Sequence, residues 1–231
     1  MRRHGKDQLL PGSREHFGFA GRHSCHRDCA ECSRFARFTL VIDWYHATAW
    51  GMPDVRSSMT PLIVTATLPP DLQAWANRLR QAHYPPERNQ LPAHLTLFHA
   101  LPWRLEEEAR GLLATLAAST PPVRARLSGI MDLGSGTALR VESPDLLHLR
   151  AEIAHHFHGM LGAQDSHEPR LHVTIQNKVP RNEAKALQQQ LAPQFQPRAF
   201  AFAGLALHRY LGGPWEPVAR WTFRGSDRRR P

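Results

Sequence analysis

Two short motifs in this 231-residue chain place a hydroxyl two residues after an imidazole: His94-Leu-Thr96 and His172-Val-Thr174. Histidine has an unperturbed pKa of about 6.5, so near neutral pH one imidazole can take up a proton while another donates one. Threonine hydroxyls can hold the non-bridging oxygens of a phosphate and stabilise the charge that develops there. The motifs therefore indicate acid–base cleavage of a phosphodiester, with two catalytic histidines, two phosphate-binding threonines and no metal required.

Strand geometry would position both motifs, because alternate residues of a strand lie on one face. Continuing this alternation predicts that Phe98 lies in a cleft beyond Thr96, and that Gln176 and Lys178 lie there beyond Thr174. We expect Phe98 to stack on a base, Gln176 to bind a base edge and Lys178 to attract a neighbouring phosphate. The alternative is that Phe98 is a core residue and Lys178 a solvated surface charge.

A repeated unit surrounds the motifs, which argues against two ordinary histidines among the 15 in the chain. Each copy runs from Pro-Asp-Leu through a helical segment, the motif strand and a second helical segment. The copies start at residues 70 and 144 and end in predicted strand pairs, 123–133 with 139–142 and 199–211 with 217–223, each turning at Leu-Gly. This order predicts an α+β fold with two lobes of mixed or antiparallel sheet, helices outside and a cleft between the lobes.

From residue 59 to about residue 224 the chain resembles the 2H phosphoesterase superfamily, in particular its bacterial 2′-5′ RNA ligase-like and RNA 2′,3′-cyclic phosphodiesterase members. The family signature is a pair of H-x-T/S-x motifs, matched here by residues 94–97 and 172–175, which begin 78 residues apart. The resemblance implies a pseudo-symmetric bilobal fold and metal-independent opening of 2′,3′-cyclic phosphates on RNA ends or small nucleotides, typically giving 2′-phosphates. It also implies that His94 donates a proton to the leaving oxygen and that His172 activates water.

Two alternatives remain open at this point. Some members of the family join or cleave 2′-5′ linkages, so a 2′-5′ RNA ligase is an alternative that would reverse the roles of the two histidines. A non-catalytic module that binds RNA or nucleotides is the other alternative. The intact histidines favour an enzyme, because threonines and basic residues would suffice to hold an anion. We expect a monomer without an obligate protein partner.

The formal net charge of +9 is weak evidence for a nucleic-acid partner, because the excess lies mostly near the ends of the chain. Residues 59–223 contain 16 Lys and Arg against 13 Asp and Glu, so any phosphate site must be local. No apolar run approaches the roughly 18–20 residues that span a bilayer, and no secretory signal is evident. We therefore expect a cytoplasmic protein that does not associate with membranes.

Residues 1–58 differ in texture from the rest, and we expect them to be a poorly ordered or spurious extension, with Met59 as the true start. Residues 225–231 form a basic tail. Cys25, Cys29 and Cys32 have a spacing found in iron–sulfur radical enzymes, but the chain shows no large barrel to accompany such a cluster. We interpret them as incidental thiols and expect no cofactor.

Overall fold

The computed structural model describes residues 60–226, which all belong to the unit Gly51–Pro231 of the chain. The hypotheses about residues 1–58, including Met59 as the start and the three cysteines, concern residues outside the described part. The last five residues of the basic tail also lie outside it. Of the helices in residues 60–226, none has the length and apolar character needed to cross a membrane.

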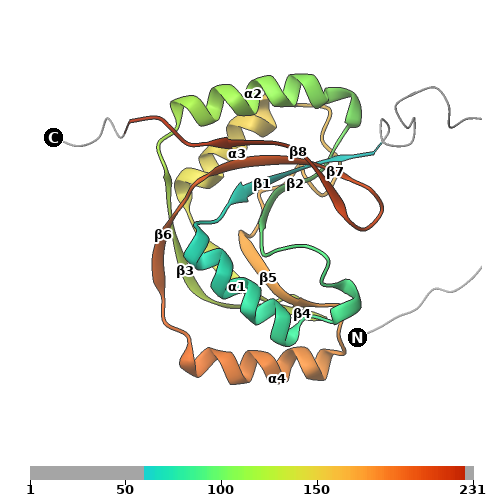
Figure 1. Cartoon of the computed structure of the whole chain (residues 1–231), viewed down its shortest axis with the longest axis vertical. Helices are drawn as coiled ribbons and strands as arrows, with labels where there is room; N and C mark the ends of the chain where they lie inside the picture. Colours follow the sequence, from blue (N-terminus) through green and yellow to red (C-terminus); the bar gives the residue numbers. More distant parts are fainter. Residues whose placement is uncertain (1–59, 227–231) are drawn as a thin grey trace, which may run out of the picture. The chain divides into compact units, whose positions relative to one another are not determined.

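Most of the predicted helices and strands are present (Figure 1). In chain order they are β1 (Leu62–Thr67), α1 (Pro70–His83), η2 (Pro86–Arg88), β2 (Leu95–Leu101), η3 (Trp103–Leu105), α2 (Glu106–Ser119), β3 (Val123–Asp132), β4 (Gly136–Glu142), α3 (Pro144–His156), β5 (His172–Asn177), α4 (Arg181–Leu191), η4 (Ala192–Gln194), β6 (Arg198–Phe202), β7 (Gly204–Tyr210) and β8 (Trp215–Thr222). The two Pro-Asp-Leu segments begin α1 and α3. Proline fits the first helical position because that residue needs no N–H partner, and aspartate in the first turn complements the helix dipole.

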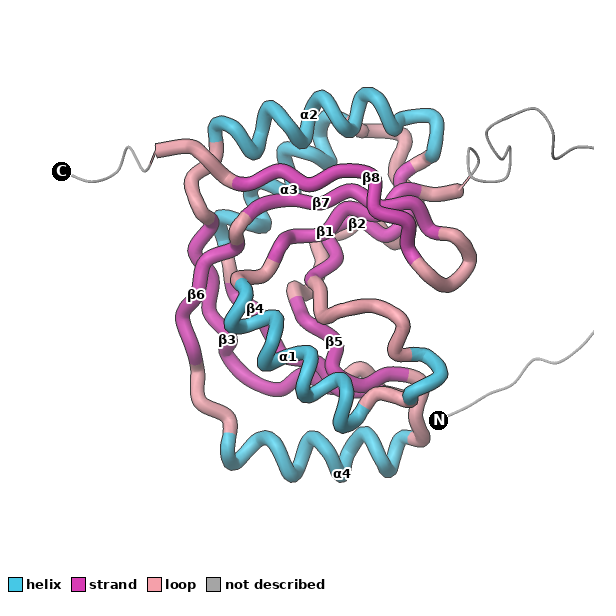
Figure 2. Tube along the Cα trace, in the orientation of Figure 1, coloured by secondary structure: helices cyan, strands magenta, loops and turns pink. Residues whose placement is uncertain are grey.

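The described strands form two four-stranded antiparallel sheets, ordered β2-β1-β7-β8 and β5-β4-β3-β6 (Figure 2). The predicted α+β class with two antiparallel sheets is therefore confirmed. Each motif strand, β2 or β5, is an edge strand of its sheet, and these two edge strands lie against one another. The topology thus brings both H-x-T motifs to the line where the two sheets meet.

The sheets exchange strands between the two sequence copies. The strand pair β3 and β4, which ends the first copy, joins motif strand β5 of the second copy, while β7 and β8 join β1 and β2. The predicted strand 199–211 is also divided, since β6 ends at Phe202 in one sheet and β7 begins at Gly204 in the other. Ala203 crosses between them, and its N–H donates to the carbonyl oxygen of Thr67 at 2.9 Å.

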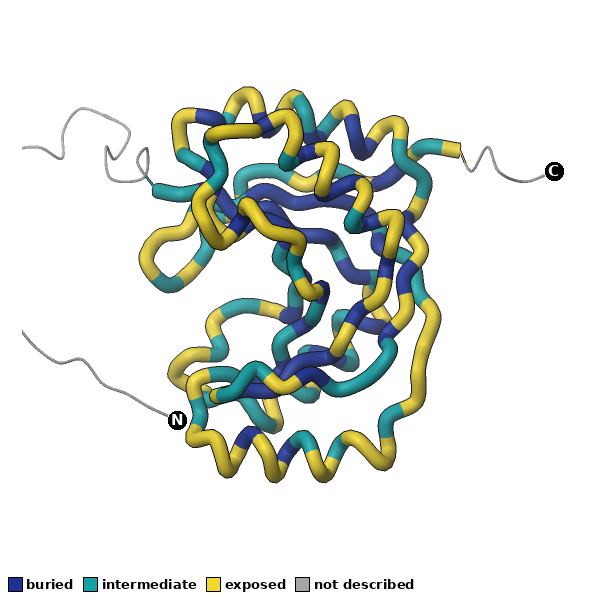
Figure 3. Tube along the Cα trace, turned by 180° about the vertical axis from the view of Figure 1, so that it is seen from behind, coloured by how far each residue is buried: buried dark blue, intermediate teal, exposed yellow. Residues whose placement is uncertain are grey.

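Helices cover the sheets and complete the core. Helix α2 packs on β7 and β8, α4 packs on β3 and β4, α1 lies along β5, and α3 contacts β3 (Figure 1). Buried residues concentrate along the strands and the inward faces of the helices (Figure 3). Both predicted Leu-Gly turns are present, and Gly134 and Gly212 adopt φ of 80° and 87°, which glycine tolerates without steric cost.

Candidate active site

A cavity of about 490 Å³ contains all four motif side chains, His94, Thr96, His172 and Thr174. Its other lining residues come from α1 and the segment after it, from the two motif strands and the loops before them, from the β3–β4 and β7–β8 turns, and from the start of β8: Arg80, Tyr84, Glu87, Arg88, Gln90, Leu91, His99, Leu133, Pro169, Arg170, Asn177, Gly213 and Trp215. Strand β2 belongs to one sheet and β5 to the other. Residues of both sheets therefore line the cavity, and the two motifs meet there.

The two histidines are oriented in the same way. The Nδ1 of His94 lies 2.8 Å from the carbonyl oxygen of Pro92, and the Nδ1 of His172 lies 2.7 Å from that of Arg170. Because a carbonyl can only accept, each Nδ1 carries a hydrogen and each Nε2 is the second, unengaged nitrogen. Within the described residues, neither Nε2 has a hydrogen-bond partner. Each ring thus offers one nitrogen for proton transfer.

The two motif threonines are half-buried, and among the described residues neither hydroxyl has a hydrogen-bond partner. Thr65 lies opposite Thr96 on the neighbouring strand β1. In contrast to Thr96, its hydroxyl is engaged, at 3.2 Å from the Nε2 of His208. The hydroxyls of Thr96 and Thr174 are therefore available to a ligand in the cavity.

The cavity lining carries an excess of positive charge. Arg80, Arg88 and Arg170 contribute three guanidinium groups, whereas Glu87 contributes the one carboxylate among the lining residues. Glu87 also lies 3.9 Å from the guanidinium of Arg88, with both side chains largely exposed. This local excess, rather than the charge of the whole chain, makes the cavity suitable for an anion such as a phosphate.

The surroundings of His94 favour its neutral form. Burial lowers the pKa of His94 to about 4, and the nearby positive charges of Arg80, His208 and His172 act in the same direction. The hydrogen bond to the backbone carbonyl acts in the opposite direction and is outweighed. The ring of Trp215 lies against the imidazole, with 4.5 Å between ring centroids and a 50° tilt. Its contact contributes to excluding water from His94.

Strand β2 contains an extra residue directly after the threonine of its motif. Adjacent residues Val64 and Thr65 of β1 pair with Phe98 and Thr96, so Leu97 has no pairing residue on β1. Such a bulge changes which face the following side chains occupy. The prediction that Phe98 lies in the cleft and stacks on a base is therefore wrong, because Phe98 is 0% exposed and belongs to the core.

Strand β5 has a bulge at the equivalent place. Adjacent residues Thr137 and Ala138 of β4 pair with Gln176 and Thr174, so Ile175 is the extra residue. Gln176 is 6% exposed and accepts a hydrogen bond from the hydroxyl of Thr137 at 3.1 Å. The prediction that it lies in the cleft and binds a base edge is therefore also wrong.

Beyond each bulge the alternation resumes one residue later, so His99 and Asn177 line the cavity. Lys178 is exposed on the loop after β5 and does not line the cavity, so its predicted placement is wrong and the solvated alternative describes it. The alternation of an unbroken strand does not bring His99 or Asn177 to the cavity, so the sequence did not indicate either residue. The adjacent apolar residues Leu97 and Phe98 are the one local signal of a break in the alternation.

Arg80 and Trp215 are two further residues that the sequence did not indicate. Arg80 is 4% exposed, donates from Nη1 to the carbonyl oxygen of Thr174 at 2.9 Å, and lies over the ring of Tyr84. Trp215 follows the Gly-Gly-Pro turn between β7 and β8 and contacts His94. Neither residue has a motif-like spacing that marks it in the sequence.

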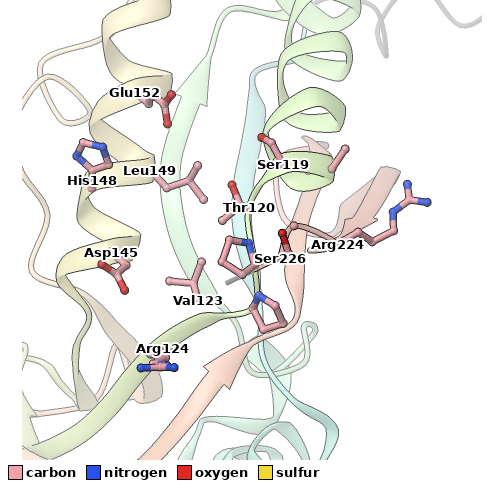
Figure 4. A pocket seen from close by; sticks show the side chains of 14 residues that line it. Ser119, Thr120, Val123, Arg124, Asp145, His148, Leu149, Glu152, Arg224 and Ser226 are labelled. Atoms are coloured by element: carbon pink, nitrogen blue, oxygen red, sulfur yellow. The ribbon is translucent and has the colours of Figure 1, made fainter. Parts of the chain in front are cut away.

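A larger cavity of about 1090 Å³ shares no lining residue with the motif cavity (Figure 4). It is bordered by acidic residues Asp145 and Glu152 of α3 and by Arg124 and Arg224. Its lining includes a single histidine, His148, whereas the smaller cavity brings the two motif histidines together. Among residues 60–226, no three His, Cys, Asp or Glu side chains converge in a way that could hold a metal ion.

The chain is similar to known proteins in sequence and in fold. The model of the 2′-5′ RNA ligase superfamily matches residues 68–214, a range that contains both motifs. TT0787 of Thermus thermophilus has a similar fold, with 20% identity and a TM-score of 0.50 over 72% of this chain and 99% of that chain. E. coli LigT complexed with NADP+ shows 19% identity and a TM-score of 0.48 over 72% of this chain and 99% of that one. No curated protein sequence matches the chain significantly.

Proposed function

Because the chain belongs to the 2′-5′ RNA ligase superfamily of 2H phosphoesterases, we propose that it opens 2′,3′-cyclic phosphates on RNA ends or small nucleotides, with His94 and His172 as the acid–base pair. One observation carries the proposal: two imidazoles with equivalent orientation line one basic cavity. The unengaged hydroxyls of Thr96 and Thr174 lie in the same cavity, where they can hold the non-bridging phosphate oxygens.

The reaction needs one proton acceptor and one proton donor. A water molecule loses a proton to one imidazole and forms a new O–P bond, while the bond between phosphorus and the ribose 3′ oxygen breaks. The other imidazolium gives its proton to that 3′ oxygen, which leaves a 2′-phosphate and a 3′-hydroxyl. Histidine nitrogens serve as both the proton acceptor and the proton donor, so the mechanism requires no metal-bound water.

The family resemblance assigns the donor role to His94 and the acceptor role to His172. The lowered pKa keeps His94 neutral at pH 7. A bound phosphodiester brings a negative charge next to the imidazole, and an opposite charge within a few ångströms raises the pKa of a histidine. His94 therefore acquires its donor proton together with the anionic substrate.

The test is turnover of adenosine 2′,3′-cyclic phosphate, and of an RNA with a 2′,3′-cyclic phosphate end, by the full chain in EDTA. We expect a 2′-phosphate product, identified by phosphorus NMR, and a loss of about 10²–10⁴-fold in kcat for His94→Ala and for His172→Ala. His158→Ala, at an exposed position outside the cavity, is the matched control. Tight RNA binding without turnover would favour the binding module, and joining of RNA ends would favour the ligase.

A further inference from the structure

His99 and Asn177 occupy equivalent positions in the two motifs but have different chemistry. Each lies five residues after a motif histidine, beyond a bulge, and each lines the 490 Å³ cavity. Asn177 is a neutral amide whose side-chain oxygen accepts the backbone N–H of Lys178 at 2.8 Å. His99 is an imidazole with a buried carboxylate as its partner. The two motifs therefore match at their histidines and threonines, but they differ five residues after the histidine, where one has His99 and the other Asn177.

Asp165 holds His99 in place. Its carboxylate accepts from the His99 side chain, with 3.1 Å between Nδ1 and Oδ1, and from the backbone N–H groups of His99 and Ala100 at 2.9 and 2.8 Å. The Asp165 side chain is 2% exposed, whereas that of His99 is 43% exposed. Arg150 donates to the backbone carbonyl oxygens of Asp165 and Leu97, which fixes the α3–β5 segment against β2. Burial alone would raise the pKa of Asp165, but the hydrogen bonds outweigh burial and lower it.

This arrangement suits His99 to bind an anion. A carboxylate at Nδ1 fixes the orientation of the ring and directs Nε2 away from Asp165, and in its protonated form the ring donates a second hydrogen from Nε2. Thr96 and His99 are three residues apart on β2, so at about 3.3 Å per residue their backbones are separated by at most roughly 10 Å. When Thr96 holds one phosphate of a substrate, His99 is thus within reach of a group next to that phosphate.

We propose that His99, positioned by Asp165, binds a second phosphate of the substrate, the one on the 5′ side of the nucleotide that carries the cyclic phosphate. This inference rests on the proposed function and narrows its substrate class. The preferred substrates are RNA ends and nucleotides with a 5′-phosphate, and nucleoside 2′,3′-cyclic phosphates without one are poorer. His94 and His172 act on the cyclic phosphate, and His99 selects for the additional one.

The experiment compares adenosine 2′,3′-cyclic phosphate with the same compound carrying a 5′-phosphate. We expect wild-type kcat/KM to favour the 5′-phosphorylated compound by about tenfold, the scale of one charge-assisted hydrogen bond. His99→Asn, which copies the residue at the equivalent position, should abolish this preference, because kcat/KM for the 5′-phosphorylated compound should fall by about tenfold more than kcat/KM for the unphosphorylated compound. His158→Asn should keep the preference, because His158 is an exposed histidine outside the cavity.

Asp165→Asn tests the positioning residue. It retains His99 but removes the carboxylate charge, so the substrate preference should fall while turnover of the unphosphorylated compound persists. The readout is this ratio, which a general loss of packing would not change, and thermal unfolding reports whether the variant folds. If Asp165→Asn does not fold, His99→Asn alone decides. An equal loss on both compounds, or an unchanged preference, in His99→Asn would overturn the inference.

A binding measurement distinguishes failure of this inference from failure of the proposed function. If the wild-type chain turns over neither compound, the proposed function fails, and calorimetry with adenosine 2′-monophosphate and adenosine 2′,5′-bisphosphate decides the role of His99. Tighter binding of the bisphosphate by the wild type, but not by His99→Asn, supports the second phosphate site. Equal binding of the two ligands by the wild type contradicts it.

Discussion

The guanidinium of Arg80 in α1 donates to the carbonyl oxygen of Thr174, 2.9 Å away, and thereby joins a helix of the first copy to the motif strand of the second. The reciprocal contact also exists. Arg150 in α3 donates to the carbonyl oxygen of Leu97, at 3.3 Å, and so joins a helix of the second copy to the motif strand of the first. Both arginines are about 5% exposed or less. Each bulged motif strand is therefore held by a buried arginine from the other copy.

Arg80→Met should lower the free energy of unfolding by about 1–3 kcal/mol, because it leaves the carbonyl of Thr174 and the side chain of Asn89 without their donor. Arg78→Met is the matched control, since Arg78 lies on the same helix and is exposed. Its unfolding free energy should stay within about 0.5 kcal/mol of the wild type. Urea denaturation measures both values. Equal stability of the two variants would show that Arg80 does not hold β5.

Phe98→Leu should affect stability and not substrate binding, because Phe98 is fully buried and packs beneath the guanidinium of Arg150. We expect the free energy of unfolding to fall by about 1–2 kcal/mol, as for a modest loss of core volume. KM for adenosine 2′,3′-cyclic phosphate should remain within about twofold of wild type. A tenfold rise in KM at unchanged stability would instead indicate contact with the base.

The sequence alone predicted that the four motif side chains share a site, because one H-x-T motif occurs at the same place in each copy of the repeated unit. His94 and Thr96 precede the bulge, as do His172 and Thr174, so simple alternation places each pair on one face. Phe98 and Gln176 each follow the bulge of their strand. An extra residue in a strand interrupts the two-residue alternation, and a single sequence does not show where that interruption falls. The placement of these two residues therefore depends on strand register, which only the folded sheets supply.

The sequence also did not predict that the two copies exchange strands between their sheets. The predicted pair 199–211 and 217–223 reads as one hairpin, yet Ala203 divides its first strand between the two sheets. Residues such as Arg80 and Asp165 act through partners more than 60 residues away along the chain. Their importance arises from tertiary contacts, so neither local spacing nor propensity marks them.

Thr96→Val and Thr174→Val should each lower kcat by about 10²–10³-fold, because each removes a hydroxyl that we propose stabilises developing charge on phosphate, while the side-chain shape is kept. Stability should change little, since neither hydroxyl has a partner among the described residues. Thr115→Val on the exposed face of α2 is the control and should retain full activity. Steady-state kinetics check the result. An unchanged kcat in both motif variants would remove the threonines from the mechanism.

Acidification from about pH 6.5 to about pH 4 should destabilise the protein through His94. The pKa of His94 is about 4 in the folded state and about 6.5 when unfolded, so in this window the unfolded chain binds a proton that the folded chain does not. The contribution of neutral His94 to the free energy of unfolding is fully present above about pH 6.5 and is lost as the pH falls towards about 4. Urea denaturation of the wild type and His94→Asn should show unfolding free energies that converge on acidification. A constant difference between them would contradict the lowered pKa.

Phosphate binding should raise the pKa of His94. In the free protein the histidine ring signal assigned through His94→Asn should titrate with a midpoint near 4, well below the ordinary 6.5. Adenosine 2′-monophosphate places a negative charge in the cavity, which favours the imidazolium and moves the midpoint upward. Proton NMR titration with and without the nucleotide measures the change. A midpoint that does not move on binding would mean that the phosphate does not contact His94, and His94 could not then acquire its proton with the substrate.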